Sequence, residues 1–256
     1  MIRRVTLPAI DERFAYFLGF LLGDGCLGRL SDPYLKLVGD LVDERDYYDR
    51  FLVPLILGLF GIGVRPRIKK GQQAYEIAFA RKQLIEYLVS KIGFPGWGEA
   101  KFIPEVIRKS SDAVKCAFLS GLFDADGTLV FSLKTYGSYC YPTVEIKSVD
   151  LSIVNTTKEM LTQLGFMASI RKSAESWVVS VNGIAQLEMW MKLIGSHNIK
   201  HLSKYFLWKE HGSCPPYTKL PERLSSLHLN PESFYYALKT KMGIDALSWT
   251  VVKCEG

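Results

Sequence analysis

Two aspartates of this chain close two similar segments that lie about a hundred residues apart. Residues 17–25 read FLGFLLGDG and residues 119–127 read LSGLFDADG, so each segment is an apolar helical run that ends in an Asp-Gly pair. A carboxylate at the C-terminal end of a helix is unfavourable by a few tenths to about 1 kcal/mol, because the helix dipole is negative there. A divalent cation would resolve this conflict, since Mg²⁺ binds oxygen ligands. The repeated arrangement therefore predicts a metal site at Asp24 and Asp126, whereas a single Asp-Gly turn would be structural.

Small residues in the same segments indicate how the two aspartates meet. Gly19 and Gly23 are four residues apart, as are Gly121 and Ala125, so each pair lies on one face of its helix. Such a strip lets two helix backbones approach closely. If these two motif helices pack through their strips, the two carboxylates converge on a pseudo-twofold axis, where a bound metal would polarise water for hydrolysis.

The similarity extends over two long units. Leu59-Phe60-Gly61-Ile62 resembles Leu164-Gly165-Phe166, and Ile92-Gly93-Phe94 resembles Ile194-Gly195-Ser196, at an offset of 102 to 104 residues. The chain is therefore a duplication rather than a short-period repeat. We expect a first half at 1–111, a second half at 112–212 and a C-terminal extension at 213–256 that packs on the second half.

The elements that position the aspartates follow the same order in each unit. Hydrophobic periodicity predicts a motif helix, two strands, a helix, two strands and a final helix. The first unit should have a helix over 43–60, interrupted near Pro54, and a basic strand over 64–69. The extension should contain a helix over 231–242. The expected fold class is α+β, with two αββαββα units, antiparallel sheets and the motif helices packed centrally.

The composition narrows the classes of protein. The chain has 256 residues and a net charge of +6, which fits a polyanionic partner without requiring one. Its five cysteines are scattered and form no Cys-x-x-Cys pair, which disfavours a zinc cage or a disulfide framework. The apolar run Phe14–Leu22 is too short to span a membrane. We expect an intracellular, cytoplasmic protein.

With these motifs described, the chain resembles the LAGLIDADG homing endonucleases, in the single-chain form with two repeats. The resemblance covers about residues 10–210 and includes the segments 198–204 and 206–209. It implies saddle-shaped sheets over the DNA major groove and Mg²⁺-dependent cleavage of both strands, with Mn²⁺ as a substitute metal. A start at Met1 and the absence of a terminal His-Asn pair favour a stand-alone, monomeric protein over an intein.

The resemblance assigns roles to individual positions. Asp24 and Asp126 match the catalytic acidic residues, and the metal site would include the preceding residues Gly23 and Ala125. Asp124 aligns with Leu22 and is expected to be structural. A basic residue late in each half is expected near the scissile phosphate, and the candidates are Lys101 and Lys200, the latter in competition with Lys204. Family members carry Gln or His after the second strand, where this chain has Gly39-Asp40.

Basic residues recur on the expected strands and turns of both halves. If they form the DNA-facing surface, phosphate contacts would supply affinity and base contacts would supply sequence choice. The alternative is a solvated strand face. The candidate DNA-binding residues are Lys36, Arg65, Arg67, Lys69, Lys70, Lys134, Lys147, Arg171 and Lys172, whereas the tryptophans, Trp97 among them, are expected in the core.

Two functions remain open from the residues and the resemblance. The first is a site-specific endonuclease that binds double-stranded DNA and cuts it at a long target. The second is a non-cleaving nucleic-acid-binding protein on the same scaffold, either an intron RNA maturase or a domesticated regulator. Retention of both aspartates favours the enzyme, because a protein that only binds a polyanion has no need of two convergent carboxylates.

Overall fold

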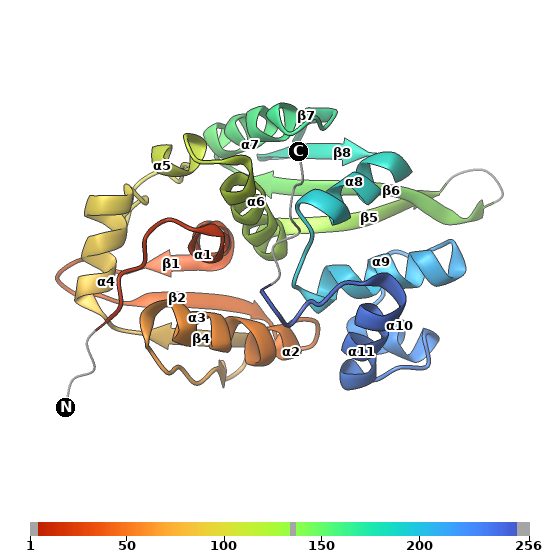
Figure 1. The fold of residues 1–256 in the computed structure, drawn as a ribbon, viewed down its shortest axis with the longest axis horizontal. Helices are drawn as coiled ribbons and strands as arrows, with labels where there is room; N and C mark the ends of the chain where they lie inside the picture. Colours follow the sequence, from red (N-terminus) through yellow and green to blue (C-terminus); the bar gives the residue numbers. More distant parts are fainter. Residues whose placement is uncertain (1–4, 134–136, 250–256) are drawn as a thin grey trace.

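The chain folds into two four-stranded antiparallel sheets with the same strand order. In the computed structural model, which describes residues 5–133 and 137–249, the first sheet has the order β1-β2-β4-β3 and the second the order β5-β6-β8-β7 (Figure 1). The repeated order confirms the expected α+β class and its duplicated arrangement. Lys134 lies outside the described residues.

The first half begins with the motif helix and ends with a short helix before the second motif. Its elements are α1 Glu12–Asp24, β1 Gly25–Leu27, β2 Leu35–Asp40, α2 Arg45–Tyr47, the π-helix η1 Tyr48–Leu52, α3 Val53–Phe60, β3 Arg67–Ile68, β4 Ala74–Phe79, α4 Lys82–Tyr87, the π-helix η2 Leu88–Ile92 and α5 Glu105–Arg108.

The second half repeats this order with longer strands, and the extension adds two helices. The elements are α6 Asp112–Asp126, β5 Gly127–Leu133, β6 Tyr139–Ser148, α7 Leu151–Gln163, β7 Ala168–Ser173, β8 Ser176–Asn182, α8 Ile184–Leu193, α9 Ile199–His211, α10 Leu220–Ser226 and α11 Pro231–Met242.

The motif helices α1 and α6 pack against each other through their small residues. A Cβ atom on Gly19 would lie 2.0 Å from the carbonyl oxygen of Phe118, and one on Gly121 would lie 2.0 Å from that of Tyr16. A Cβ on Gly23 would lie 2.5 Å from the Cβ of Ala125. The helices are therefore in backbone contact along their length, as the strips predict, and any larger side chain at these glycines would force them apart.

Each motif helix continues directly into a strand, without a loop. Gly25 and Gly127 have extended backbone angles, so they are not left-handed helix caps. A Cβ on Gly25 would lie 2.1 Å from the carbonyl oxygen of Leu21, and one on Gly127 would lie 2.3 Å from that of Phe123. Glycine follows each aspartate because the chain turns tightly there, and this turn places the aspartates at the base of the sheets.

Two expected elements differ in the structure. The basic strand expected over 64–69 is reduced to Arg67–Ile68, because Pro66 has no N–H to donate to a neighbouring strand. The helix expected over 43–60 contains a π-helical turn at Tyr48–Leu52 before α3, in which Pro54 is one of the first two residues. Pro54 has no N–H to donate, and it directly follows the π-helical turn, in which the N–H of Val53 bonds the carbonyl of Tyr48.

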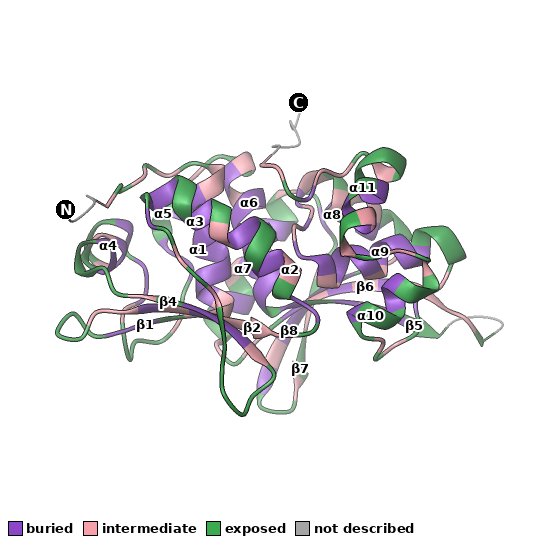
Figure 2. Ribbon diagram, turned by 90° about the horizontal axis from the view of Figure 1, so that it is seen from below, coloured by how far each residue is buried: buried purple, intermediate pink, exposed green. Residues whose placement is uncertain are grey.

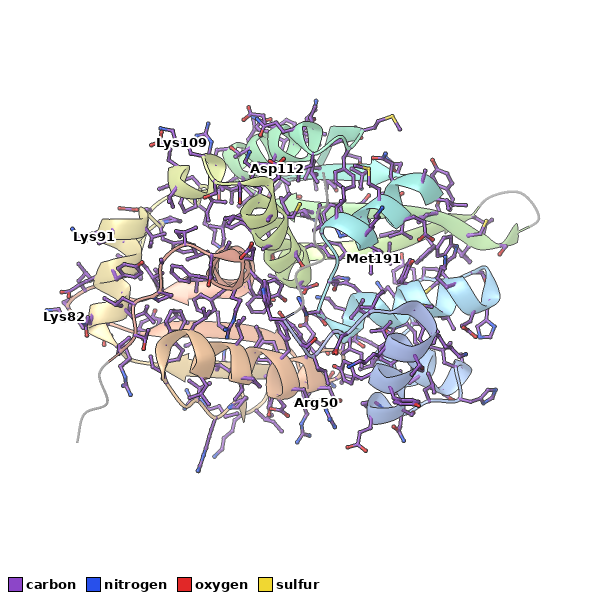
Figure 3. The ribbon with its side chains drawn as sticks, in the orientation of Figure 1. Arg50, Lys82, Lys91, Lys109, Asp112 and Met191 are labelled. Carbon is purple, nitrogen blue, oxygen red and sulfur yellow. The ribbon has the colours of Figure 1, made fainter. Side chains whose placement is uncertain are left out.

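The extension lies against both halves of the chain. The backbone N–H of Leu220 donates a 2.6 Å hydrogen bond to Asp43, and Arg50 forms a 3.2 Å ion pair with Glu232. Arg50 projects from the first half toward α11 in Figure 3. Near its end, the extension stacks Trp249 on the ring of His197, with centroids 5.2 Å apart. The extension thus bridges the two halves rather than resting on the second alone.

Both sheets lie along one side of the molecule, and most helices cover their other faces (Figure 2). The core is continuous from the first half to the second and combines residues of α1 and α6 with the inward strand faces and the helices that cover them. None of the helices in the described parts of the chain has the length and apolar character needed to cross a membrane. A functional site is therefore expected on the uncovered sheet faces or at the C-terminal ends of α1 and α6.

Candidate active site

The structure brings Asp24 and Asp126 to adjacent positions at the ends of the packed motif helices. A Cβ on Gly23, the residue before Asp24, would lie 3.2 Å from Cγ and Oδ2 of Asp126. Asp24 is partly buried and Asp126 is exposed. Two helix C-terminal ends and two carboxylates therefore share one small region, with the negative ends of both dipoles directed at it.

This concentration of negative charge changes the protonation of the aspartates. Burial and the neighbouring carboxylates of Glu44 and Asp126 together raise the pKa of Asp24 to about 8, against the opposing effect of Lys200 and Lys101. Although Asp126 is exposed as a residue, partial loss of water around its carboxylate raises its pKa, while Lys101 and Lys200 act to lower it. The raised pKa values show that too little positive charge surrounds the two carboxylates to keep both ionised. A bound cation would supply that charge.

Each candidate lysine comes from a segment late in one half and lowers the pKa values of Asp24 and Asp126 by its charge. Lys101 donates hydrogen bonds of 2.7 Å and 3.0 Å to the carbonyl oxygens of Leu22 and Gly23, the last turn of α1. Lys200, in the first turn of α9, forms a 2.8 Å ion pair with Glu44. Lys204 points elsewhere, donating 3.2 Å to the carbonyl oxygen of Leu129 on β5. Of the two lysines that compete for the second half, Lys200 is therefore the one beside the carboxylates.

Asp124 is fully buried and accepts hydrogen bonds from three donors. The hydroxyl of Tyr16 donates at 2.6 Å and the backbone N–H of His197 at 2.7 Å, and the hydroxyl of Ser196 donates to the other carboxylate oxygen. Burial raises the pKa of Asp124 to about 6, although these hydrogen bonds oppose the rise. The Asp124 carboxylate on α6 is thus hydrogen-bonded to α1 and to the segment before α9.

The donor atoms around Asp24 and Asp126 fit a hard divalent cation. They are carboxylate oxygens and helix-end carbonyl oxygens, which Mg²⁺ and Mn²⁺ accept. No cluster of three or more His, Cys, Asp or Glu side chains suited to a metal occurs in residues 5–133 and 137–249. A metal here would therefore complete its shell with backbone carbonyls, water and substrate oxygens. Lys101 already donates a hydrogen bond to the carbonyl oxygen of Gly23, so a metal bound there would share that atom with Lys101.

On the first sheet, the basic residues are partly neutralised. Arg67 and Lys36 both approach the buried carboxylate of Glu76, at 2.8 Å and 3.6 Å. β3 contains only Arg67 and Ile68, so Arg65 and Lys69 lie outside the strand that was expected over 64–69. The backbone N–H of Lys69 closes the following turn with a 3.0 Å bond to Ala74. Of the basic candidates on or next to the first sheet, Arg65, Arg67, Lys69 and Lys70 are exposed.

The basic residues of the second sheet divide between its two faces. Arg171 pairs with Glu145 across the open face at 2.9 Å. Lys172 is its direct neighbour in β7 and so points to the other face, near the ring of Trp177. Lys147 lines the pocket that also contains Asp126 and Lys101. The second sheet thus presents Lys147 and Arg171 on its open face, but not Lys172.

Three residues at or near the site were missed by the sequence reasoning. Glu44 and Asn198 are buried and joined by a 2.7 Å hydrogen bond although they are 154 residues apart, a pairing that no local motif indicates. Trp97, expected in the core, is 50% exposed. Its ring lies 3.8 Å from the guanidinium of Arg29, beside β1. The Gly-rich context of Trp97 at 96–98 was the available signal for an exposed loop.

Comparison with known proteins agrees with this fold. Residues 113–195 match the family of LAGLIDADG-like domains. A solved structure of mesophilic variants of the homing endonuclease I-DmoI has a TM-score of 0.54 at 19% identity, over 73% of this chain and 96% of that one. The N-terminal LAGLIDADG domain of DUF199/WhiA has a TM-score of 0.50 at 17% identity, over 73% of this chain and 83% of that one.

Two curated relatives are similar in sequence over most of this chain. An uncharacterized protein of Methanocaldococcus jannaschii, MJ1054, is 24% identical over 80% of this chain and 24% of its own length. A probable translation initiation factor IF-2 of Thermococcus kodakarensis is 23% identical over 73% of this chain and 15% of its own length. The chain thus spans about a quarter or less of these relatives. Residues 113–195 thus contain a LAGLIDADG-like domain, and the duplicated fold of this chain is that of the solved LAGLIDADG structures.

Proposed function

We propose that this chain is a site-specific endonuclease that binds a long double-stranded DNA target through the major groove and hydrolyses both strands with Mg²⁺. The observation that carries the proposal is the pair Asp24 and Asp126 at the joined ends of α1 and α6, with a lysine from a late segment on each side. The proposal takes support from the fold, since solved I-DmoI structures of similar fold contain target DNA with Mg or Mn.

The duplicated fold suggests how a duplex would be bound. Each half, 1–111 and 112–212, would contact one half of an asymmetric target with the open face of its sheet. A single chain supplies both halves, so we propose a monomer. The net charge of +6 favours association with a polyanion. The open sheet faces also carry Glu76 and Glu145, whose ion pairs with Arg67 and Arg171 partly neutralise these two arginines.

In the proposed mechanism, the chain's own residues would bind the metal and offset the negative charge of the DNA phosphates. Asp24 and Asp126, with the carbonyls of Gly23 and Ala125, would hold the metal, which when bound supplies a polarised water and stabilises the leaving oxygen. Lys101 and Lys200 lie where their ammonium groups can offset charge that develops on a phosphate. The raised pKa of Asp24 means that this carboxyl must lose a proton as the site is loaded.

The test begins from a target that is unknown. Protein bound to a randomised duplex pool without metal would be recovered and its DNA sequenced, and the enriched duplex would then be incubated with Mg²⁺. Double-strand cleavage by the wild type, and none by Asp126→Asn with binding retained, is the expected result. Enrichment of a duplex that the wild type never cuts would overturn the endonuclease assignment in favour of a DNA-binding regulator. Enrichment of RNA alone from a parallel pool would favour a maturase.

A further inference from the structure

The candidate site is not symmetric, and the difference lies in one buried carboxylate. We infer that Glu44 is a positioning residue that holds the ammonium group of Lys200 beside Asp24, and that this tether makes the two halves of the site unequal. This inference rests on the proposed endonuclease function for its kinetic consequence. The tether itself is a property of the free protein.

Glu44 is 3% exposed, and both of its carboxylate oxygens are occupied. Oε1 accepts 2.8 Å from Nζ of Lys200 and 2.7 Å from Nδ2 of Asn198. Oε2 accepts 2.7 Å from the backbone N–H of Asp40. A carboxylate with three donors in a buried setting is fixed in orientation, so it is better suited to holding Lys200 than to binding metal itself.

Asn198 connects this tether to the end of the second motif helix. Its side-chain amide also donates 2.9 Å to the backbone carbonyl of Asp124, two residues before Asp126. Asn198 is fully buried and caps the first turn of α9, where Lys200 lies. The position of Lys200 is therefore set from both halves: Glu44 belongs to the first, and Asn198 with Asp124 belongs to the second.

The backbone of β2 is shaped to admit the Glu44 carboxylate. A Cβ on Gly39 would lie 2.7 Å from Oε2 of Glu44 and 2.6 Å from the ring of Tyr48. A side chain at position 39 would therefore displace the Glu44 carboxylate or the Tyr48 ring. Glu44, from the turn before α2, fills the space that a polar side chain at the end of β2 would otherwise take. This explains why Gly39-Asp40 stands where the resemblance led us to expect Gln or His.

The second half has no matching tether. Asp150 precedes α7 as Glu44 precedes α2, and it lines the same pocket as Lys101 and Asp126. Aspartate is one methylene shorter than glutamate. Within residues 5–133 and 137–249 Lys101 forms no ion pair, and its ammonium group donates to the carbonyls of Leu22 and Gly23 instead. One lysine of the site is thus bound to a carboxylate and the other to a helix end.

This difference has a consequence for each lysine. Burial acts to lower the pKa of Lys200, but the carboxylate of Glu44 outweighs it and raises the pKa. Lys200 is thereby kept charged, and it lowers the pKa of Asp24 more than Lys101 does, whereas Lys101 has the larger effect on Asp126. Misplacement of a reacting group by about 1 Å can cost about 100-fold in rate. Loss of Glu44 should therefore impair the half-site of Asp24 and Lys200 selectively.

The first arm of the test measures the tether without any DNA. Reductive methylation of the free protein, read by mass spectrometry, reports the reactivity of each lysine. Glu44→Gln should increase labelling of Lys200 several-fold and leave Lys101 unchanged, because the neutral amide that replaces the carboxylate has one acceptor oxygen for three donors. Glu105→Gln, which removes a carboxylate from a surface pair with Lys109, is the matched control. Unchanged labelling of Lys200 in the Glu44 variant would overturn the tether.

The second arm follows the two strands of an enriched duplex, labelled separately, under single-turnover conditions. Glu44→Gln should slow one strand by about 10- to 100-fold, change the other by less than about 3-fold and accumulate nicked DNA. Equal slowing of both strands would overturn the inference. If Glu44→Gln lowers the melting temperature sharply, Glu44→Asp keeps the charge, withdraws it from Lys200 and should give the same asymmetry. A wild type that cuts nothing would refute the endonuclease proposal but leave the labelling result intact.

Discussion

The hydroxyl of Tyr16 donates a 2.6 Å hydrogen bond to the carboxylate of Asp124 across the contact between the two motif helices. The same tyrosine contributes the carbonyl oxygen against which Gly121 packs. The joint that carries the candidate site is thus held at two levels, by close backbone packing and by a buried polar network. Asp124 accepts the hydrogen bonds of this network, whereas Asp24 and Asp126 lie nearer the C-terminal ends of the two helices.

Removing the Asp124 carboxylate should destabilise the protein strongly. Asp124→Ala would leave the hydroxyls of Tyr16 and Ser196 and the N–H of His197 without their acceptor. Each buried unsatisfied donor costs about 1–3 kcal/mol, so we expect a loss of at least about 3 kcal/mol in the free energy of unfolding. Denaturant unfolding measures it. Asp112→Ala, on the exposed first turn of the same helix, should cost less than about 1 kcal/mol. Similar losses for both would contradict the network.

Substitution of the packed glycines should separate the motif helices. Gly121→Ala places a Cβ 2.0 Å from a backbone oxygen that cannot move without the helix, so we expect a loss of about 2–4 kcal/mol. Gly63→Ala is the control, because nothing lies within 4 Å of its Cβ position. It should change stability by less than about 0.5 kcal/mol. A thermal unfolding series that showed no difference between the two variants would argue against the backbone contact.

The carboxyl of Asp24 should make the free protein less stable as pH rises. Its folded pKa of about 8 lies above the unfolded value of 3.8, so the folded state binds more protons between these values and stability falls with increasing pH. Asp24→Asn removes the ionisation. We expect it to raise Tm at pH 8 by about 3–6 °C, corresponding to about 1–2 kcal/mol, and to have little effect near pH 4. Calorimetry across this range measures the difference. A Tm gain that is the same at both pH values would show that Asp24 ionises normally.

Much of the architecture could be predicted because it depends on local spacing. The strips at Gly19, Gly23, Gly121 and Ala125 indicated the helix packing, and the repeated offset indicated the duplication. The helix over 231–242 matched α11 because Asn230 caps its start and Gly243, in a left-handed conformation, ends it.

The missed features depend on contacts between distant segments or on single backbone groups. Glu44 and Lys200 are 156 residues apart and meet only once both halves are assembled. Strand β3 is short because Pro66 has no N–H for strand pairing. The pattern of charged residues over 64–69 gives no sign of this effect. The faces of Arg171 and Lys172 depend on strand register, which composition does not specify.

The buried carboxylate of Glu76 should restrain DNA binding by the first sheet. Burial acts to raise its pKa, but Arg67 and Lys36 outweigh this effect and lower it, so Glu76 stays ionised at neutral pH. Glu76→Gln would release positive charge for phosphate contacts. We expect about 3- to 10-fold tighter binding at low salt and a salt slope steeper by about one. Fluorescence anisotropy over a salt series measures both quantities. Glu210→Gln, in a surface pair with Lys241, should change neither. Weaker binding by Glu76→Gln would mean that the ion pair organises Arg67 for contact.

The central claim is that Asp24 and Asp126 jointly support metal-dependent hydrolysis of DNA. Its most direct test is the single-turnover cleavage rate of an enriched duplex over a Mg²⁺ titration, for the wild type, Asp24→Asn and Asp126→Asn, with binding measured in parallel. The account predicts saturable Mg²⁺ dependence in the wild type, and loss of double-strand cleavage by at least about 100-fold in both variants while DNA affinity is kept or increased. Cleavage that proceeds unchanged in either variant, or in the wild type with chelator in place of Mg²⁺, would contradict it.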